Sequence, residues 1–483
     1  MNSFAALDAT AQAQLVRRGE VSPTELVSEA IAAAEAVNPR LNAIIHERFD
    51  KALAEASTVS SRLPFAGVPI VVKDLDGTLA GEPYHAGTKH LRDHAYVATE
   101  TCEWFRRLQN AGFIIIGKTN TPEFGLVPTT EPQSYGATRN PWNPSHSPGG
   151  SSGGSAASVA AGIVAVGHAG DGGGSIRIPA SECGLVGLKP SRGRVPLGPV
   201  DTESWGGLVT RFAVSRSVRD TASLLDLAAP PALGEVYGAP SPSRPYVTEL
   251  LVPHEPLTIA YTTGAADGTP TDPEVVAAVE RTAQVLAALG HRVVETAPKQ
   301  FGDPDFFAEL TAHFLTVYPV WVAQSLAELE TLTGVAVTPE TVEPLTWSLA
   351  ETGRAVSGAD FVIALDALRR RCRELQEPWG DGFDLLLTST LPELPPTLGQ
   401  FDATSDNPLH GVFRSAPIVA NAIPLNMTGQ PAISVPAGRS ATGLPIGAQL
   451  IGGFGREDLL LRVAAELEIA APWAGQRPGI FAG

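Results

Sequence analysis

The chain has 483 residues, of which 43% are hydrophobic and only 18% are charged, so it has ample apolar material for a large core and no compositional sign of disorder. Its formal net charge of -17 repels phosphate backbones and anionic lipid surfaces, and we expect neither a nucleic-acid partner nor a membrane partner. Three widely separated cysteines fit neither a disulfide framework nor a cysteine-based zinc site. The first residues lack the basic start and apolar stretch of a signal peptide, and the small-apolar run 156–166 is too short to cross a bilayer. These features predict a cytoplasmic protein.

The first predicted elements alternate between helices and short buried strands. Residues 22–25 read Ser-Pro-Thr-Glu, a capping box that predicts a helix directly after it. The β-branched run 68–72 predicts a buried strand with Lys73 at its end. A helix over 99–111 is expected to stop before a strand at 113–116.

The second half repeats this alternation around less regular segments. Asp272 begins a helical stripe that leads to a strand at 293–294. Proline and serine in 229–256 and 376–412 predict long surface connections on either side of a helical insert at about 305–375. The chain therefore belongs to the α/β class, with a largely buried sheet.

The segment 147–178 carries two serines within glycine runs. Such runs are typical of flexible linkers as well, but apolar sequence of the buried type surrounds both of these. Gly172, Gly173 and Gly174 can turn several N–H groups toward one point, which makes a site for an oxyanion while the Ser175 hydroxyl attacks a carbonyl. Asp171 and Arg177 flank this loop, and they are expected either to pair and hold its shape or to be unrelated surface charges.

A serine nucleophile needs a base, and the sequence offers a lysine for this role. His146 and His168 lie nearest to the serines, in positions where histidine is more often structural or solvated. Only six lysines occur against 28 arginines, and Lys73 follows the apolar run 68–72. Burial disfavours the charged form of an amine, which suits it to accept a proton near neutral pH. From this stretch alone, a strand-end lysine that reaches solvent is an equal alternative.

These segments closely resemble the amidase signature family of serine hydrolases. The resemblance rests on an ordered set of motifs outside about 200–420: GVPIVVKD at 67–74, IGKTNTPEFG at 116–125, the serine and glycine cluster, GLVGLKPSRGRV at 184–195, GQPAISVPAG at 429–438 and GLPIGAQLIGGFGREDLLLRVAAELE at 443–468. It implies the amidase signature fold, a large mixed and twisted β-sheet covered by helices on both faces. It also implies one domain over 1–483, divided into N-terminal helices at about 1–60, a signature core at about 64–200, a variable substrate-side region at about 305–420 and a C-terminal part of the core at about 421–475.

The resemblance implies a role for each motif serine and for the lysine. Ser175 is expected to be the nucleophile, Ser151 a relay serine that follows a cis peptide bond, and Lys73 the general base. Gly172, Gly173 and Gly174 are expected to supply oxyanion-hole amides, and Ser152 to orient Ser151. No cofactor and no metal are implied, and a homodimer is expected from the resemblance alone.

The expected substrate is a small, uncharged, hydrophobic amide or carbamate, which is cleaved through a seryl acyl-enzyme. Gly125, Thr129 and Thr130 are expected to contact it. Aromatic residues of the helical insert offer either apolar pocket walls or ordinary core, namely Phe306, Phe307, Phe314, Tyr318, Trp321 and Trp347. Gly170 stands where the family more often has threonine, which predicts a more pliable loop and a larger pocket. The loop is similar to that of the branch with nylon-oligomer cyclic amide hydrolases and urethane-cleaving amidases.

Other interpretations are less well supported. Ser151 also fits the G-x-S-x-G nucleophile elbow, but prolines before it forbid the strand that an elbow requires. Glutaminase subunits of tRNA-dependent amidotransferases usually carry glutamine where this chain has Ile178. An esterase that uses the same serines and lysine, and an inactive binding protein on the same scaffold, remain as alternatives.

Overall fold

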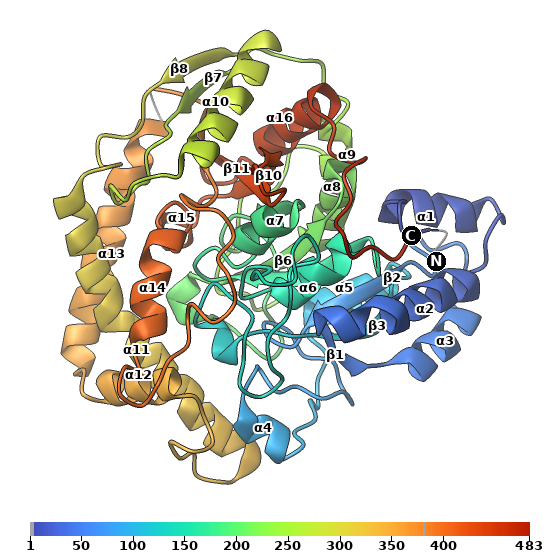
Figure 1. Cartoon of the computed structure of the whole chain (residues 1–483), viewed down its shortest axis with the longest axis horizontal. Coiled ribbons are helices and arrows are strands. Elements are labelled where there is room, and N and C mark those ends of the chain that lie inside the picture. The colour runs from blue at the N-terminus through green and yellow to red at the C-terminus, as the bar shows by residue number, and fades with distance from the viewer. Residues whose placement is uncertain (1–3, 380–381) are drawn as a thin grey trace.

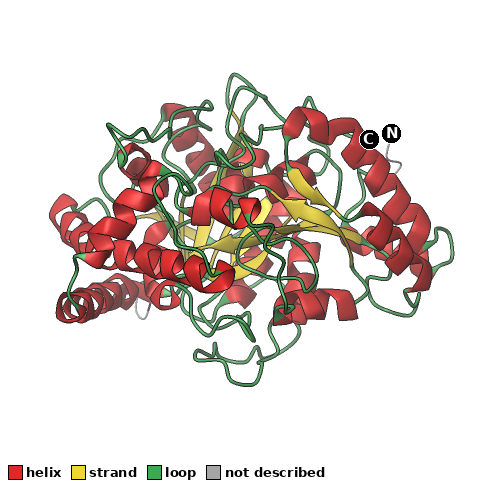
Figure 2. Cartoon of the chain, turned by 90° about the horizontal axis from the view of Figure 1, so that it is seen from below, coloured by secondary structure: helices red, strands yellow, loops and turns green. Residues whose placement is uncertain are grey.

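A computed structural model describes residues 4–379 and 382–483, and a mixed β-sheet runs through its middle (Figure 1). In this part of the chain the sheet has 11 strands, in the order β1-β3-β2-β4-β6-β5-β10-β11-β9-β7-β8. Figure 2 shows helices on both faces of the sheet, so the expected mixed sheet between helical layers is confirmed. The strands are β1 (Ile44–Glu47), β2 (Pro69–Lys73), β3 (Ile114–Thr119), β4 (Val166–Asp171), β5 (Val186–Lys189), β6 (Thr210–Ser215), β7 (Thr258–Tyr261), β8 (Arg292–Glu295), β9 (Leu385–Ser389), β10 (Ala432–Arg439) and β11 (Pro445–Gly452).

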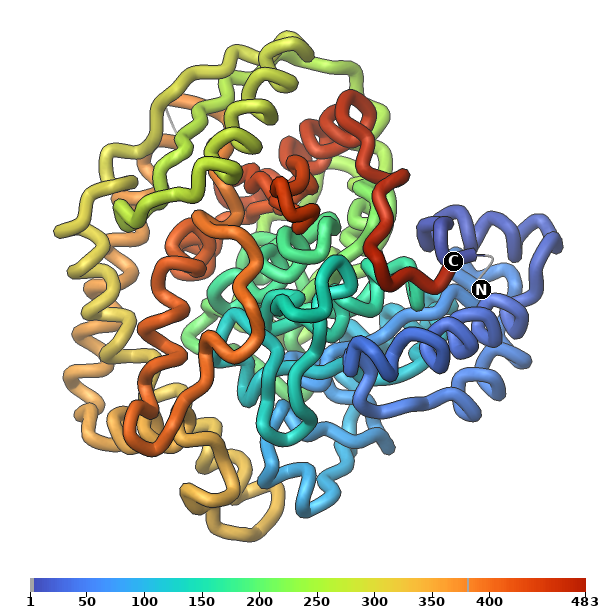
Figure 3. Tube along the Cα trace, in the orientation of Figure 1, coloured from blue at the N-terminus to red at the C-terminus, as the bar shows by residue number. Residues whose placement is uncertain are grey.

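The helices that cover the sheet come from the whole length of the chain. The α-helices are α1 (Ala9–Arg17), α2 (Pro23–Leu41), α3 (Phe49–Thr58), α4 (Lys89–Asp93), α5 (Glu103–Asn110), α6 (Gly153–Ala160), α7 (Arg177–Cys183), α8 (Val218–Ala228), α9 (Tyr246–Glu249), α10 (Pro273–Ala288), α11 (Pro304–Thr333), α12 (Pro344–Arg354), α13 (Gly358–Gln376), α14 (His410–Val419), α15 (Ile423–Thr428) and α16 (Glu457–Ala470). Short 3-10 turns are η1 (Glu123–Gly125), η2 (Trp205–Gly207) and η3 (Glu377–Trp379). The tube in Figure 3 shows the last residues returning to the side of the molecule where the N-terminal helices lie. The Ala482 N–H donates there to the carbonyl of Ala161, the residue after α6, at 2.8 Å.

Local sequence signals explain most of these boundaries. The predicted capping box is present, because Ser22 Oγ accepts from the Glu25 N–H while the Glu25 carboxylate accepts from the Ser22 N–H. Asp272 caps α10 through a single bond, since its side chain accepts from the Glu274 N–H, and Pro273 occupies the first helical position. The helix predicted over 99–111 is shorter than expected and begins at Glu103, since the chain at Cys102 is still extended.

One predicted connection contains a strand instead. The segment 376–412 was expected to be a surface connection, yet its residues Leu385–Ser389 form β9, which is buried along its whole length between β11 and β7. The five residues read LLLTS, a short apolar run that is sufficient for a strand buried on both faces. The prolines that suggested a loop all lie outside this strand.

Three parallel strands bring the predicted site together. Strand β2 pairs in parallel with β3 on one side and with β4 on the other. Because the carboxyl ends of parallel strands meet at one edge of a sheet, Lys73 at the end of β2 and Asp171 at the end of β4 lie at the same edge. The loops that follow these two strands therefore face one another.

The predicted helical insert consists of α11, α12 and α13, and α11 packs against both of the others. By length and apolar composition, α11 is the one helix among residues 4–379 and 382–483 that could cross a bilayer. The buried core helix of a globular protein passes the same test, and 44% of the most apolar stretch of α11 is buried. This property therefore does not by itself indicate a membrane protein.

Candidate active site

Lys73 lies at the end of β2 with its side chain almost fully buried. Its Nζ donates to Ser151 Oγ at 2.8 Å and forms an ion pair with Asp76 Oδ2 at 2.7 Å. The expected meeting of Lys73 and Ser151 is therefore present, and the alternative of a lysine that reaches solvent is excluded. Asp76 is an additional member of the site, which the sequence analysis did not identify.

Ser151 is held in a tightly packed turn. The Gly150–Ser151 peptide bond is cis, as expected, and Gly149 has a φ of 80°. Thr130 Oγ1 donates to the Gly149 carbonyl at 2.9 Å and accepts from the Gly153 N–H at 3.2 Å. A Cβ on Gly150 would lie 2.3 Å from the Thr129 carbonyl oxygen, so only glycine fits there.

These contacts correct the roles expected for Thr129 and Thr130. Neither residue lines the cavity described below, and both side chains are buried and hydrogen-bonded within the protein. They support the turn that carries Ser151. Gly125, the third expected substrate contact, does line the cavity, and a Cβ on it would lie 2.9 Å from Ser151 Oγ.

The Ser152 hydroxyl connects this turn to the end of β4. It donates to the Gly170 carbonyl at 3.1 Å and accepts from the Gly170 N–H at 3.2 Å. Ser152 therefore fixes the serine turn against the nucleophile loop through the backbone, and its hydroxyl group bonds to Gly170 instead of to Ser151.

A buried ion pair shapes the loop that carries Ser175. Arg177 Nε and Nη2 donate to the two oxygens of Asp171 at 2.9 and 3.0 Å, and neither side chain is exposed. Burial alone would raise the pKa of Asp171, but the charge and hydrogen bonds of Arg177 lower it well below its usual value. The predicted pairing of Asp171 with Arg177 is present, and the surface-charge alternative is excluded.

Asp171 also uses one of the expected oxyanion donors. The Gly174 N–H donates to Asp171 Oδ1 at 2.8 Å, which corrects the expectation that Gly174 supplies an oxyanion-hole amide. Gly172 and Gly173 line the cavity beside Ser175, so they remain as candidate donors together with the N–H of Ser175.

Two distant residues complete this buried network. Asn426 Nδ2 donates to Asp171 Oδ1 at 2.8 Å, and its Oδ1 accepts from Arg177 Nη2 at 2.7 Å. Gln449 Oε1 accepts from Arg177 Nη1 at 2.8 Å. Gln449 belongs to the quoted motif at 443–468 and lies in a strand buried along its length, where a glutamine requires hydrogen-bond partners. That was the available signal for its role, whereas Asn426 gave none.

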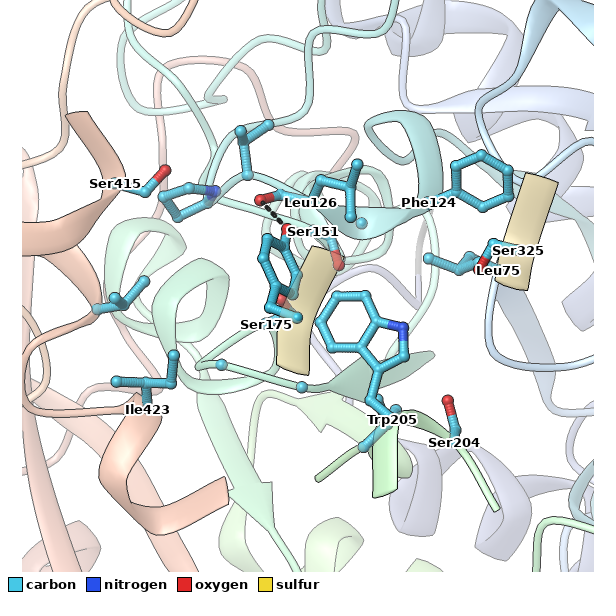
Figure 4. Close-up of a pocket in the computed structure, with 18 of the residues that line it drawn as sticks. Leu75, Phe124, Leu126, Ser151, Ser175, Ser204, Trp205, Ser325, Ser415 and Ile423 are labelled. Atoms are coloured by element: carbon cyan, nitrogen blue, oxygen red, sulfur yellow. Dashed lines mark hydrogen bonds between the residues drawn. The ribbon is translucent and has the colours of Figure 1, made fainter. Parts of the chain in front are cut away.

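Ser151 and Ser175 both line a cavity of about 380 Å³, which is of the size that takes a small molecule. Figure 4 shows the two serines next to each other, with Trp205 on one side and Ile423 on the other. The large apolar lining residues include Leu75, Phe124, Trp205, Phe314, Tyr318 and Ile423.

The aromatic residues of the helical insert were expected to be either pocket walls or ordinary core, and the structure divides them between the two. Phe307, Phe314 and Tyr318 line it, whereas Phe306, Trp321 and Trp347 pack in hydrophobic clusters around it. Trp205 comes from the segment before β6 and stacks on Trp321 with ring centroids 6.4 Å apart. Trp205 was not among the residues that were predicted from the sequence to line the cavity.

The charges around the cavity are mostly negative. Its described lining contains a single cationic side chain, Arg211, which pairs with Asp201. The carboxylates in the lining are those of Asp76, Asp201, Glu203, Asp267 and Glu328. This distribution disfavours an anionic ligand and is compatible with an uncharged one.

In the described part of the chain, no histidine lies in the cavity lining next to Ser151 and Ser175. His168 lies in β4 and its Nδ1 accepts from the Lys73 backbone N–H at 3.3 Å. Burial and the nearby charge of Lys73 lower the pKa of His168 well below its usual value, so it is neutral and has a structural role.

Within the described ranges 4–379 and 382–483, two side-chain groups have the composition of metal ligands, but both already bind protein partners. His46, Asp74 and His85 lie within 4.8 Å of one another, and Lys118 Nζ donates to Asp74 Oδ1 at 2.5 Å. His254 and His291 each bind one oxygen of Glu466 at 2.8 Å, while His291 Nδ1 accepts from the Leu257 N–H. Neither group lines the cavity.

Comparison with known proteins gives one consistent result. Residues 25–461 match the family model described as Amidase. The 6-aminohexanoate-cyclic-dimer hydrolases of Pseudomonas sp. (strain NK87) and Paenarthrobacter ureafaciens are each 41% identical over 482 residues, which cover 98% of this chain and 97% of the relative. A solved structure of 6-aminohexanoate cyclic dimer hydrolase complexed with substrate is 41% identical, with 99% of both chains covered and a TM-score of 0.95. A bacterial aryl acylamidase of the amidase signature family is 26% identical, with 97% and 98% covered and a TM-score of 0.85.

Proposed function

This chain belongs to the amidase signature family of hydrolases that cleave carbon–nitrogen bonds, and we propose that it opens small, uncharged cyclic amides through a seryl acyl-enzyme. Ser175 is the nucleophile, Ser151 relays its proton, and Lys73 accepts it. The observation that carries the proposal is the 2.8 Å contact between Lys73 Nζ and Ser151 Oγ at a cavity that Ser175 also lines.

The proposed reaction has two balanced steps. In the first, Ser175 Oγ attacks the amide carbonyl while its proton moves through Ser151 Oγ to neutral Lys73, and the same path returns a proton to the leaving nitrogen. The oxyanion that forms is stabilised by the N–H groups of Gly172, Gly173 and Ser175. In the second step, water attacks the acyl ester along the same proton path and releases the acid.

The lining of the cavity supports an uncharged and largely apolar substrate. Aromatic and aliphatic side chains dominate its walls, and carboxylates outnumber its one described cation. A cyclic amide suits this lining because it has no terminal carboxylate. Relatives at 41% identity are named as hydrolases of such a cyclic amide, the 6-aminohexanoate cyclic dimer.

The same features argue against a glutaminase subunit. Ile178 lines the cavity with an apolar side chain at the position where those subunits usually carry glutamine. An α-amino acid substrate would also bring a carboxylate next to the acidic lining.

Three expectations from the sequence remain predictions. They are the division of residues 1–483 into regions of a single domain, the homodimer and the cytoplasmic location.

A hydrolysis panel tests the proposal. Cyclic amides, linear aliphatic amides, aryl amides, carbamates and esters are assayed with the wild type, Ser175→Ala and Lys73→Ala. We expect the highest kcat/KM for a cyclic amide, loss of turnover in Ser175→Ala, and a drop of about 10²- to 10⁴-fold in Lys73→Ala. Glutaminase activity, or amide turnover that survives in Ser175→Ala, would contradict the proposal.

A further inference from the structure

The amine of Lys73 is held between two oxygen atoms, Ser151 Oγ at 2.8 Å and Asp76 Oδ2 at 2.7 Å. We propose that Asp76 is a positioning residue that fixes the Lys73 amine on Ser151, and that the absence of a side chain at Gly170 makes this arrangement possible. The inference rests on the proposed function, in which Lys73 accepts the proton of the nucleophile.

The backbone at Asp76 is specialised for this contact. Its φ is 63°, in the left-handed region that few residues other than glycine, asparagine and aspartate adopt. This turn brings a side chain from three residues after Lys73 back over the end of β2. The next residue, Gly77, packs against Phe105, and a Cβ there would lie 2.6 Å from its ring. The turn is therefore fixed by packing on the side away from the cavity.

Gly170 is the steric complement of Asp76. A Cβ added to Gly170 would lie 2.0 Å from Asp76 Oδ2 and 2.4 Å from its Cγ. Gly170 cannot move away easily, because its N–H and carbonyl both bond to Ser152. The structure corrects the expectation that Gly170 enlarges the pocket, since the Asp76 carboxylate fills the space.

The other carboxylates near Asp76 have cationic partners of their own, so Asp76 is the carboxylate that pairs with Lys73. Asp74 bonds to Lys118, and Asp201 pairs with Arg211. His168 interacts electrostatically with Lys73, and Tyr84 and Arg211 interact with Asp76. The remaining charged groups, Asp74, Lys118 and Asp201, act on these three side chains in turn.

The two neutral members of that set do not compete for the lysine. Burial, together with the charges of Asp201 and Asp76, raises the pKa of Tyr84 well above its usual value, so its hydroxyl stays protonated. His168 is neutral because its pKa is lowered. Asp76 is therefore the group that holds the Lys73 amine against Ser151 Oγ.

The first test is the pH profile of kcat/KM on a cyclic amide. Asp76→Asn removes the charge but keeps the shape and tolerates the left-handed backbone. We expect the rising limb of this profile to differ from that of the wild type, because the charge that contacts the Lys73 amine is removed. Asp366→Asn, which removes an exposed carboxylate paired with Arg370, serves as the matched control and keeps the wild-type profile.

The second test uses the steric coupling and does not depend on Asp76→Asn folding well. Gly170→Ala displaces the Asp76 carboxylate, and kcat falls by about 10²-fold if the lysine amine loses its position. Asp76→Gly fits the same backbone and frees the space, so adding Gly170→Ala to it changes kcat by less than about twofold. Additive losses in the double variant would overturn the steric coupling.

The activity of Lys73→Ala shows whether only the inference about Asp76 fails or the proposed function fails as well. If Lys73→Ala is inactive and Asp76→Asn has the wild-type pH profile, the role of Asp76 is refuted and the proposed function stands. If Lys73→Ala turns over at the wild-type rate, the proposed function fails, and the inference about Asp76 fails with it.

Discussion

Replacing Asp171 by asparagine tests whether the buried ion pair shapes the nucleophile loop. The Asp171 carboxylate accepts five hydrogen bonds, from the N–H groups of Gly174 and Ile176, from Nε and Nη2 of Arg177, and from Asn426 Nδ2, at 2.8 to 3.2 Å. Asparagine offers a single acceptor oxygen and leaves the fully buried Arg177 without its countercharge. Removing one partner of a buried pair costs about 3–5 kcal/mol of the free energy of unfolding.

The free energy of unfolding lost in Asp171→Asn is expected not to depend on pH over the range of an enzyme assay. Arg177 holds the pKa of Asp171 well below its usual value, although burial alone would raise it. A carboxyl with a lowered folded-state pKa contributes stability that is complete above its unfolded value, about 3.9, and is lost only as the pH falls through the folded value. Asp171→Asn should therefore destabilise the protein equally at pH 6 and pH 9.

A second buried ion pair provides the control. Arg194 and Glu457 are buried to a similar degree and pair at 3.1 Å, but neither lines the cavity. Glu457→Gln should lose a similar roughly 3–5 kcal/mol while kcat/KM stays near that of the wild type. Asp171→Asn should in addition lose about 10²-fold in kcat/KM, because the N–H groups of the loop lose their orientation. Urea denaturation and initial rates measure both effects, and a destabilised Asp171→Asn with wild-type kcat/KM would refute the reasoning.

Three further predictions concern the surroundings of the site. Burial and the charge of Glu343 raise the pKa of Glu123 to about 8 in the folded protein. Between pH 4.5 and pH 8 the folded protein therefore keeps a proton on Glu123 that the unfolded chain has lost. The free energy of unfolding falls as the pH rises through this range. Glu123→Gln should remove that loss, and its melting temperature should rise above that of the wild type between pH 5 and pH 8. Gly150→Ala should lower kcat by about 10²-fold because its Cβ overlaps the Thr129 backbone, whereas Gly358→Ala, with open space around its Cβ position, should leave kcat unchanged. Trp205→Ala removes an apolar wall of the cavity, and KM for an apolar cyclic amide should rise about tenfold with a smaller change in kcat.

Much of the site follows from local sequence patterns. A lysine after a β-branched run had to lie at a strand end, and parallel pairing of β2 with β4 brought that end beside the glycine-rich loop. The pairing of Asp171 with Arg177 was one of two alternatives that the sequence left open, and one short turn between the two residues allows it. The glycine run before Ser151 includes Gly149, whose φ is positive in the structure, and Gly150, where a Cβ would overlap Thr129.

The remaining contacts depend on the tertiary structure. Asp76 reaches Lys73 only through a left-handed turn, which its neighbours in sequence do not require. Asn426 is separated from Asp171 by 255 positions, so no local pattern joins them. Thr129 and Thr130 belong to the expected loop, but their direction toward the Ser151 turn depends on packing.

Covalent labelling of the nucleophile tests the central claim most directly. A serine-directed phosphonate is incubated with the wild type, Ser175→Ala and Lys73→Ala, and the modified peptide is identified by mass spectrometry. We predict one adduct on Ser175 in the wild type, no adduct in Ser175→Ala and much slower labelling in Lys73→Ala. Labelling of Ser175→Ala at the wild-type rate, or labelling that does not depend on Lys73, would contradict it.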